Sequence, residues 1–183
     1  MSDIADRYRK VAAAFTARVG GVPADAWENP APCEGWVARD VVRHLVEWMP
    51  SLYFDQAGLT PPEIPSPDDD PAAAWQALDR ALERLLDTPD LATREFDSQV
   101  GRMSVEGIID MTGTPDILVH TWDLARATGQ DERLDPDEVH NLYEGMLPYD
   151  EAMRSSGHYG PRVEVPADAD EQTKLLAFTG RHV

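Results

Sequence analysis

The amino-acid sequence predicts an all-α protein organised as a helical bundle. Apolar residues recur three and four positions apart in several segments, which is the spacing of one face of an α-helix. Glycine and proline stand where such segments end or begin, and capping residues precede some of them. There is no internal repeat, and no alternation of strands with helices that would indicate a parallel sheet. These observations favour packed helices.

The first half of the chain contains three helical patterns. They predict helices over residues 3–19, 37–56 and 71–87. The first helix stops at Gly20 and Gly21, as a helix C-terminus often does. Pro50 lies inside the second pattern and predicts a kink or an early end, because proline has no backbone N–H to donate. The proline-rich stretch 58–71 is expected to be an exposed loop.

The region between residues 88 and 101 is ambiguous. Residues 94–100 have an extended character, but no clear partner strand. Asp135, followed by Pro136 and Glu138, is a strong helix start with an N-cap and a proline at the first helical position. The remaining patterns predict an extended piece at 163–166 and helices over 135–147 and 171–178.

The region between residues 105 and 128 allows two interpretations. In the first, a short helix over 105–111 is followed by a new helix, with Thr114 as its N-cap and Pro115 at its first position. Gly129 would end that helix. The alternative is one long helix from 105 to 128 that is kinked at Pro115.

Length and charge narrow the class of protein. The 183 residues suit one domain, expected over 1–183. The formal net charge of −18 disfavours nucleic acid and anionic membrane surfaces as partners. The only cysteine is Cys33, so no intramolecular disulfide is possible. The N-terminus lacks the pattern of a signal peptide and no apolar run would span a bilayer. We expect a cytoplasmic monomer or homodimer that acts on a small molecule.

A candidate metal site lies in the later helix. Asp116 precedes His120 by four residues and Asp123 follows it by three, so all three share one helix face. Carboxylates around a histidine on an inward face are costly unless a cation compensates them. His44, on the apolar stripe of the second helix, would supply a third ligand. Three protein ligands with an open fourth position are typical of catalytic zinc-type sites.

Plainer interpretations stand beside this one. His44 can be a buried structural histidine with a partner for each ring nitrogen. Asp116 suits the positive N-terminus of a helix that starts at Thr114. Cys33 precedes the second helix, where a helix dipole can lower a thiol pKa, but a small buried residue packing the loop is the commoner case. Glu47 is expected to be solvated, and Trp36, Trp48 and Trp122 to line the core or a pocket.

Several motifs resemble one known family. Residues 32–36 read PCEGW and residues 39–45 read RDVVRHL, which is similar to the start of the second helix in that family. Residues 116–129 read DILVHTWDLARATG, and a weaker echo runs from Tyr159 through 163–166. These segments resemble the N-terminal domain of mycothiol-dependent maleylpyruvate isomerase, within the DinB-like superfamily.

The resemblance implies a DinB-like four-helix bundle with a long crossover and a short C-terminal appendage. It implies a divalent metal, zinc or nickel, held by His44, Asp116 and His120. Asp123 would accept the free N–H of a ligand histidine, although it can instead cap a loop or pair with Arg126. Mycothiol or a similar thiol would be the co-substrate. The isomerase carries Glu where this chain has Asp116, and its further C-terminal domain finds no room in 183 residues.

Three functions fit these residues. The first is a metal-dependent transferase or isomerase that uses a low-molecular-weight thiol, activated as a thiolate by the metal. The second is a metal-activated hydrolase, and the third is a non-enzymatic, metal-stabilised bundle that binds a small molecule. A bundle without metal remains the plainest alternative. For an anionic substrate, Arg43, Arg102 and Arg126 are the nearest cationic candidates along the chain.

Overall fold

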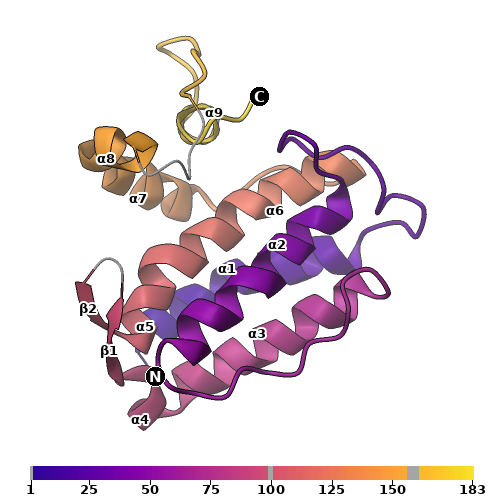
Figure 1. Ribbon diagram of the computed structural model, residues 1–183. Helices are drawn as coiled ribbons and strands as arrows, with labels where there is room; N and C mark the ends of the chain where they lie inside the picture. The colour runs from indigo at the N-terminus through magenta and orange to yellow at the C-terminus, as the bar shows by residue number, and fades with distance from the viewer. Residues whose placement is uncertain (1, 99–100, 156–160) are drawn as a thin grey trace.

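The computed structural model describes residues 2–98, 101–155 and 161–183, and within them the protein is mostly helical. Four long helices form a bundle (Figure 1). They are α1 (Asp3–Gly20), α2 (Ala38–Pro50), α3 (Pro71–Asp87) and α6 (Thr114–Thr128). Helices α1 and α2 each pack against α3 and α6, so α1 and α2 are diagonal to each other. The all-α prediction is confirmed. Among the described residues, no helix has both the length and the apolar character needed to cross a membrane.

Helices α1 and α3 begin and pack as their sequences predict. The Asp70 side chain caps α3 by accepting from the backbone N–H of Ala73, and Pro71 takes the first helical position. Phe15 of α1 and Trp75 of α3 are fully buried and meet edge to face, with ring centroids 4.6 Å apart. The Trp75 indole N–H donates to Thr16 Oγ1, which satisfies its polar atom inside the core.

Helix α2 changes character at Pro50. The regular α-helix ends there, and a π-helical turn, η1 (Ser51–Asp55), continues the path. The N–H of Gln56 donates to Ser51 O, five residues back, which is the π pattern. The predicted early end is confirmed for the α-helix, although the chain stays helical to Asp55.

The connection from α1 to α2 is a long crossover, residues 21–37, between diagonal helices. It closes with a small turn in which the Ala31 N–H donates to Trp36 O. Gly35 has φ +78°, a left-handed conformation that glycine adopts without steric cost. The turn places Cys33 and Trp36 beside the start of α2.

The ambiguous region forms a short helix and a hairpin. Helix α4 (Pro89–Ala92) leads to strands β1 (Glu95–Ser98) and β2 (Gly101–Ser104). The strands are antiparallel, with Phe96 opposite Met103. The extended character predicted for 94–100 is therefore correct over β1, and its partner is the segment that follows directly. Val100 lies outside the described residues.

The path from Val105 to Thr128 is one continuous helical run. It consists of α5 (Val105–Ile108), the π-helical turn η2 (Ile109–Gly113) and α6. The prediction that Thr114 is an N-cap is wrong: Thr114 has helical angles of φ −60° and ψ −44°, and its N–H donates to Ile109 O. The alternative, a single long helix, describes the chain better, because the π turn accommodates Pro115 without a break.

The π turn leaves a carbonyl that a distant arginine satisfies. Pro115 cannot donate to Asp110 O, five residues before it. Arg7 of α1 donates from Nη1 to that carbonyl oxygen at 3.3 Å and to Asp110 Oδ1 at 2.7 Å. Arg7 Nε also pairs with Glu138 Oε2 at 2.7 Å. One arginine therefore joins the first helix, the π turn and the C-terminal region.

The C-terminal appendage lies along one side of the bundle, next to α6 (Figure 1). It contains α7 (Pro136–Met146), the 3-10 turn η3 (Leu147–Tyr149), α8 (Asp150–Ser155) and α9 (Glu171–Phe178). Asp135 caps α7 as predicted, accepting from Asp137 and Glu138. The predicted extended piece at 163–166 forms no strand, although the Val163 N–H donates to Ala177 O. Tyr159 of the C-terminal motif lies outside the described residues.

Candidate metal centre

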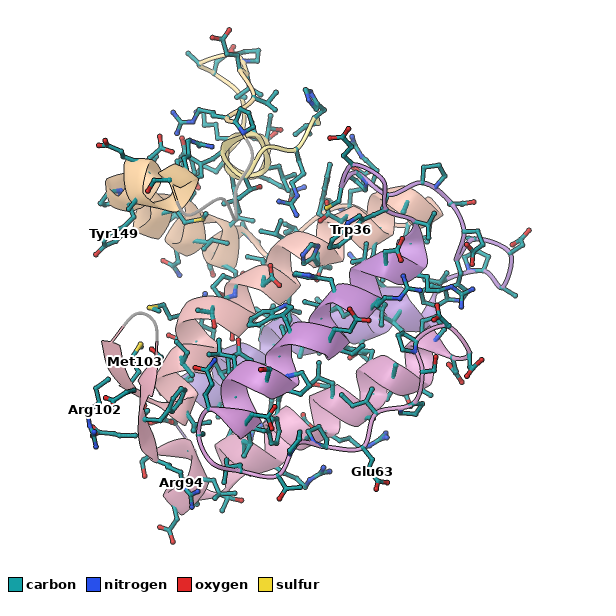
Figure 2. The ribbon with its side chains drawn as sticks, in the orientation of Figure 1. Trp36, Glu63, Arg94, Arg102, Met103 and Tyr149 are labelled. Carbon is teal, nitrogen blue, oxygen red and sulfur yellow. The ribbon has the colours of Figure 1, made fainter. Side chains whose placement is uncertain are left out.

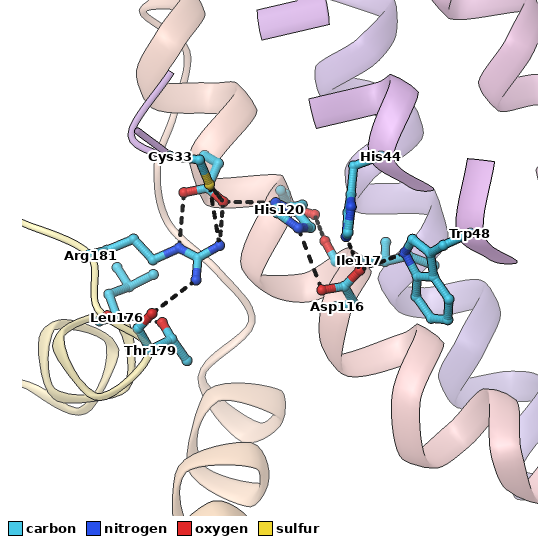
Figure 3. Close-up of polar contacts among 11 residues, drawn as sticks. Cys33, His44, Trp48, Asp116, Ile117, His120, Leu176, Thr179 and Arg181 are labelled. Atoms are coloured by element: carbon cyan, nitrogen blue, oxygen red, sulfur yellow. Dashed lines mark hydrogen bonds and ion pairs between the residues drawn. The ribbon is translucent and has the colours of Figure 1, made fainter. Parts of the chain in front are cut away.

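Three potential metal ligands converge where α2 faces α6 (Figure 3). His44 Nε2 lies 3.1 Å from Asp116 Oδ2, and His120 Nε2 lies 3.4 Å from Asp116 Oδ1. The ligand atoms of all three residues lie within 4.8 Å of one another. The four-residue spacing on α6 brings Asp116 and His120 together, and the packing of α2 against α6 adds His44.

The distances suit a divalent ion. Ligands that share a tetrahedral ion at about 2.0–2.1 Å lie about 3.4 Å from one another. The two distances to Asp116, 3.1 and 3.4 Å, are close to that separation. Two imidazole nitrogens and one carboxylate would hold the ion and leave a position open. The His44 and Asp116 side chains are 34% and 29% exposed, so the open position has access to solvent.

The charge of Asp116 is stabilised by its neighbours. Burial opposes its ionisation, but the ring of His120 and a hydrogen bond from His44 outweigh burial and hold its pKa below the ordinary 3.8. The indole N–H of Trp48 also donates to Asp116 Oδ2, at 3.2 Å. This carboxylate is therefore ionised and oriented toward the two histidines.

A buried ion pair lies behind His120. The Nδ1–H of His120 donates to Asp123 Oδ2 at 2.8 Å, which leaves Nε2 directed at Asp116. Arg181 Nη2 donates to the same Asp123 oxygen at 2.7 Å, and Arg181 Nε to Oδ1 at 3.2 Å. Burial raises the pKa of Asp123, but His120 and Arg181 outweigh it and bring the pKa to about 2. This arrangement fixes the tautomer of His120.

Cys33 lies beside this ion pair and stays protonated. Its Sγ is 3.7 Å from Asp123 Oδ2 and 3.7 Å from Arg181 Nη2. Burial, followed by the charge of Asp123, raises the pKa of the Cys33 thiol to about 12. Its position before α2 therefore does not make it a reactive thiolate. Cys33 is half-buried, and its sulfur lies between Asp123 and Arg181. Cys33 also forms a second possible ligand group with His120 and Asp123.

Aromatic rings surround the histidines. The Trp36 ring stacks on His120 at 5.8 Å and 16°, and lies 5.2 Å from His44. Trp48 lies 6.1 Å from His44 and 5.5 Å from Tyr53, measured between ring centroids. Trp36 and Trp48 are partly buried, and both form walls of the site. This agrees with the expectation that they line the core or a pocket.

A small cavity of about 30 Å³ opens next to Asp116. Its lining comes from the start of α6 (Pro115, Asp116 and Val119), from α7 (Leu142 and Met146) and from the end of the chain (Thr179 and Arg181). The cavity therefore has one polar end, where Asp116 and Arg181 lie, and an apolar wall contributed by α7.

The arginines expected to serve the site lie elsewhere. Arg43 pairs with Asp40 and Asp68. Arg126 pairs with Glu132 at 2.7 Å and not with Asp123. Arg102 projects from the hairpin at the edge of the molecule, away from Trp36 (Figure 2), and pairs with Glu95. The surface position expected of Glu47 is confirmed.

The cation that the sequence analysis missed is Arg181. It follows Gly180, whose position after a helical pattern is a signal for a helix end, but no spacing links it to Asp123 across 58 residues. The hydrogen bond from Trp48 to Asp116 was also not anticipated, because a wall position does not reveal the direction of the indole N–H. Among the other histidines, His140 pairs with Glu171 on the surface, and His158 lies outside the described residues.

The mostly helical fold and the His44–Asp116–His120 group define the chain as a DinB-like domain. More specifically, the chain belongs to the mycothiol maleylpyruvate isomerase N-terminal domain family, whose model matches residues 8–125. The match includes His44, Asp116, His120 and Asp123, whereas Arg181 lies beyond it.

Two curated relatives extend the similarity to nearly the whole chain. Each is described as an uncharacterized protein of Mycobacterium tuberculosis, one from strain CDC 1551 / Oshkosh and one from strain H37Rv. Each is 29% identical to this chain over 178 residues, which cover 96% of both partners. No solved structure matches the chain.

Proposed function

We propose that the protein binds a divalent metal, zinc or nickel, through His44, Asp116 and His120. The observation that carries this proposal is the convergence of the three ligand atoms within 4.8 Å, on two facing helices. Two nitrogen ligands and one carboxylate suit zinc and nickel alike. Asp123 orients His120, and Trp48 orients Asp116.

We further propose that the centre serves a metal- and thiol-dependent transferase or isomerase. A divalent ion at such a site acts as a Lewis acid that lowers the pKa of a thiol or water at the open position. Mycothiol or a similar low-molecular-weight thiol is the co-substrate, in keeping with the family.

The chain's own residues bind and orient. His120 presents the lone pair of Nε2, and His44 would present one once a metal replaces the proton that it shares with Asp116. Asp116 adds a negative charge that favours a cation. Trp36 and the Trp48 ring limit water near the reacting group, which strengthens electrostatic interactions there. The cavity of about 30 Å³ beside Asp116 would admit one or two water molecules. We place this activity in a cytoplasmic monomer or homodimer with neither nucleic acid nor membrane as partner, in keeping with the net charge of −18.

The first experiment measures metal. The purified, tag-free protein and its His44→Ala/His120→Ala double variant are analysed by elemental mass spectrometry. His140→Ala is the matched control, because His140 is an exposed histidine paired only with Glu171 among the contacts given for it. We expect near-stoichiometric zinc or nickel in the wild type and the control, and none in the double variant. Absence of metal from the wild type after reconstitution would overturn the proposal.

The second experiment separates thiol chemistry from the alternatives. The Co²⁺-loaded protein is titrated with mycothiol, and with S-methylated mycothiol as control. A sulfur-to-cobalt charge-transfer band with the free thiol alone supports thiol activation. Turnover of ester or amide substrates without any thiol would instead establish a metal-activated hydrolase. Metal binding with neither thiol binding nor turnover would establish a non-enzymatic, metal-stabilised bundle.

A further inference from the structure

Arg181 comes from the end of the chain and contacts the centre that the bundle builds. We infer that Arg181 is a positioning residue: it orients Asp123, and through it His120, and so couples docking of the C-terminal segment to metal binding. The inference rests on the proposed metal site. Arg181 makes no hydrogen bond or ion pair with the three ligands among the described contacts. Its charge acts on Asp116, with which it lines the small cavity, and its positioning role is argued from its contacts with Asp123.

Arg181 makes a bidentate contact with Asp123. Arg181 Nε and Nη2 donate to the two different oxygens of Asp123, at 3.2 and 2.7 Å. Such a fork fixes the plane of a carboxylate as well as its position. Oδ2 also accepts the Nδ1–H of His120 at 2.8 Å, and the Cys33 thiol lies 3.7 Å from it. The plane of Asp123 therefore sets the ring of His120.

Asp123 needs this counter-charge because it is buried. Its side chain is 0% exposed, and the Arg181 side chain is 14% exposed. A buried carboxylate is costly to leave without a cationic partner. Without Arg181, Asp123 would keep only His120 and the weak S–H donor of Cys33 among the described contacts. Its carboxylate could then rotate, and the His120 ring would lose its fixed direction.

The end of α9 aims Arg181 at the bundle. Gly180 has φ +89°, a left-handed conformation, and the Arg181 N–H donates back to Leu176 O at 2.9 Å. This is the pattern of a glycine-terminated helix end, in which the chain reverses sharply. Arg181 Nη1 also donates to Thr179 O at 3.2 Å, which fixes the guanidinium within its own turn. Leu176 packs with Val119 and Trp122 of α6 and seats the segment.

These contacts make the C-terminal segment part of the centre. The match to the family model ends at residue 125 and so does not cover this segment. If docking of Arg181 favours the ligand geometry of His120, metal binding must favour docking by the same factor. Two separate experiments test the two effects.

The first test is metal affinity. Zn²⁺ binding is measured by competition with a chromophoric chelator for the wild type, Arg181→Gln and Arg181→Lys. Arg162→Gln is the matched control, because Arg162 lies over the Phe178 ring at 4.7 Å and so contacts the same helix without contact to Asp123 in the described interactions. We expect a loss of about 10–100-fold for Arg181→Gln, which is the usual effect of removing an outer partner. Arg181→Lys should lose less, since it keeps the charge without the fork.

The second test is hydrogen–deuterium exchange of residues 171–183, with and without Zn²⁺. We expect Zn²⁺ to slow exchange in the wild type and in Arg162→Gln, and to have no effect there in Arg181→Gln. Wild-type affinity in Arg181→Gln, or an equal loss in Arg162→Gln, would overturn the inference while the metal site stands. A wild type that binds no Zn²⁺ would overturn the proposed function itself. If Arg181→Gln does not fold, Arg181→Lys carries the test, and wild-type affinity with unchanged protection there would overturn the inference.

Discussion

The indole N–H of Trp48 and the carboxylate of Asp116 are joined by a hydrogen bond of 3.2 Å to Oδ2, the same oxygen that faces His44. Trp48 therefore holds a proposed ligand in place from within α2. A donor that orients a ligand carboxylate is part of a metal site even though it does not touch the ion.

The Trp48→Phe variant should bind Zn²⁺ about tenfold more weakly, because Asp116 loses its orienting donor. Phenylalanine keeps the ring packing against Tyr53, so the thermal midpoint without metal should change little. Isothermal titration calorimetry measures the affinity. Trp27→Phe, a change in a partly buried tryptophan that packs on the core, is the control and should bind as the wild type does. Unchanged affinity in Trp48→Phe would show that the hydrogen bond has no role in metal binding.

Metal should stabilise the fold. Ligand at 100 times its Kd stabilises a protein by about 2.7 kcal/mol. For a protein of this size, that corresponds to a rise in thermal midpoint of about 5–10 °C. Differential scanning calorimetry with Zn²⁺, and then with EDTA, measures the change. The His44→Ala/His120→Ala variant should show no response to either addition, and an equal response there would place the stabilising ion elsewhere.

Cys33 should react slowly in the folded protein. With its pKa raised from 9.0 to about 12, the thiol stays protonated at pH 8, whereas unfolding exposes an ordinary thiol. Iodoacetamide labelling at pH 8, followed by mass spectrometry, should therefore be much faster in urea than in buffer. Labelling at equal rates in both would contradict the raised pKa.

The same raised pKa gives stability a pH dependence. The folded chain keeps the Cys33 proton to a higher pH than the unfolded chain, so this contribution to stability is present below pH 9 and falls as the pH rises from about 9 to 12. Urea titrations across that window should show a smaller decline in Cys33→Ser than in the wild type. Parallel declines in the two proteins would mean that Cys33 is not the group responsible.

Substitution of two glycines by alanine should change the stability of the protein in opposite directions. A Cβ at Gly113 would lie 2.5 Å from the Tyr53 hydroxyl oxygen, whereas a Cβ at Gly145 meets nothing within 4 Å. Gly113→Ala should therefore destabilise the protein by about 1–3 kcal/mol through overpacking. Gly145→Ala, in α7, should stabilise it by about 0.5–1 kcal/mol through backbone entropy. Urea denaturation midpoints measure both changes. A shift of the two midpoints in the same direction would contradict the prediction.

Much of the fold could be predicted from the sequence because long amphipathic helices have a recognisable spacing of apolar residues. Helices α1 and α3 carry continuous apolar stripes, and their caps agree with those stripes. The hairpin could not be predicted in this way, because β2 (Gly101–Ser104) lacks the alternation of buried and exposed residues that marks a strand. Its first two residues are exposed and its last two are half-buried. A pairing of only four residues depends on its neighbours more than on its own pattern.

The candidate site divides in the same way. The spacing from Asp116 to His120 is local, so the helix period alone places both on one face. The apolar stripe places His44 on an inward face but equally suits a structural histidine, so its assignment beside Asp116 came from the family resemblance, and the two side chains lie 3.1 Å apart. The contact of Arg181 with Asp123 could not be inferred, because it depends on how α9 packs on α6. Packing between distant helices gives no periodic pattern in the sequence.

The π turn η2 contains one residue more than an α-helical turn of the same rise would need. Each residue turns an α-helix by about 100°. The additional residue of η2 therefore determines which way the side chains of α6 face relative to those of α5. Deleting it would swing Asp116 and His120 together away from α2 while leaving both side chains, and their spacing, intact. The centre is accordingly sensitive to the length of a segment that contributes none of its ligands.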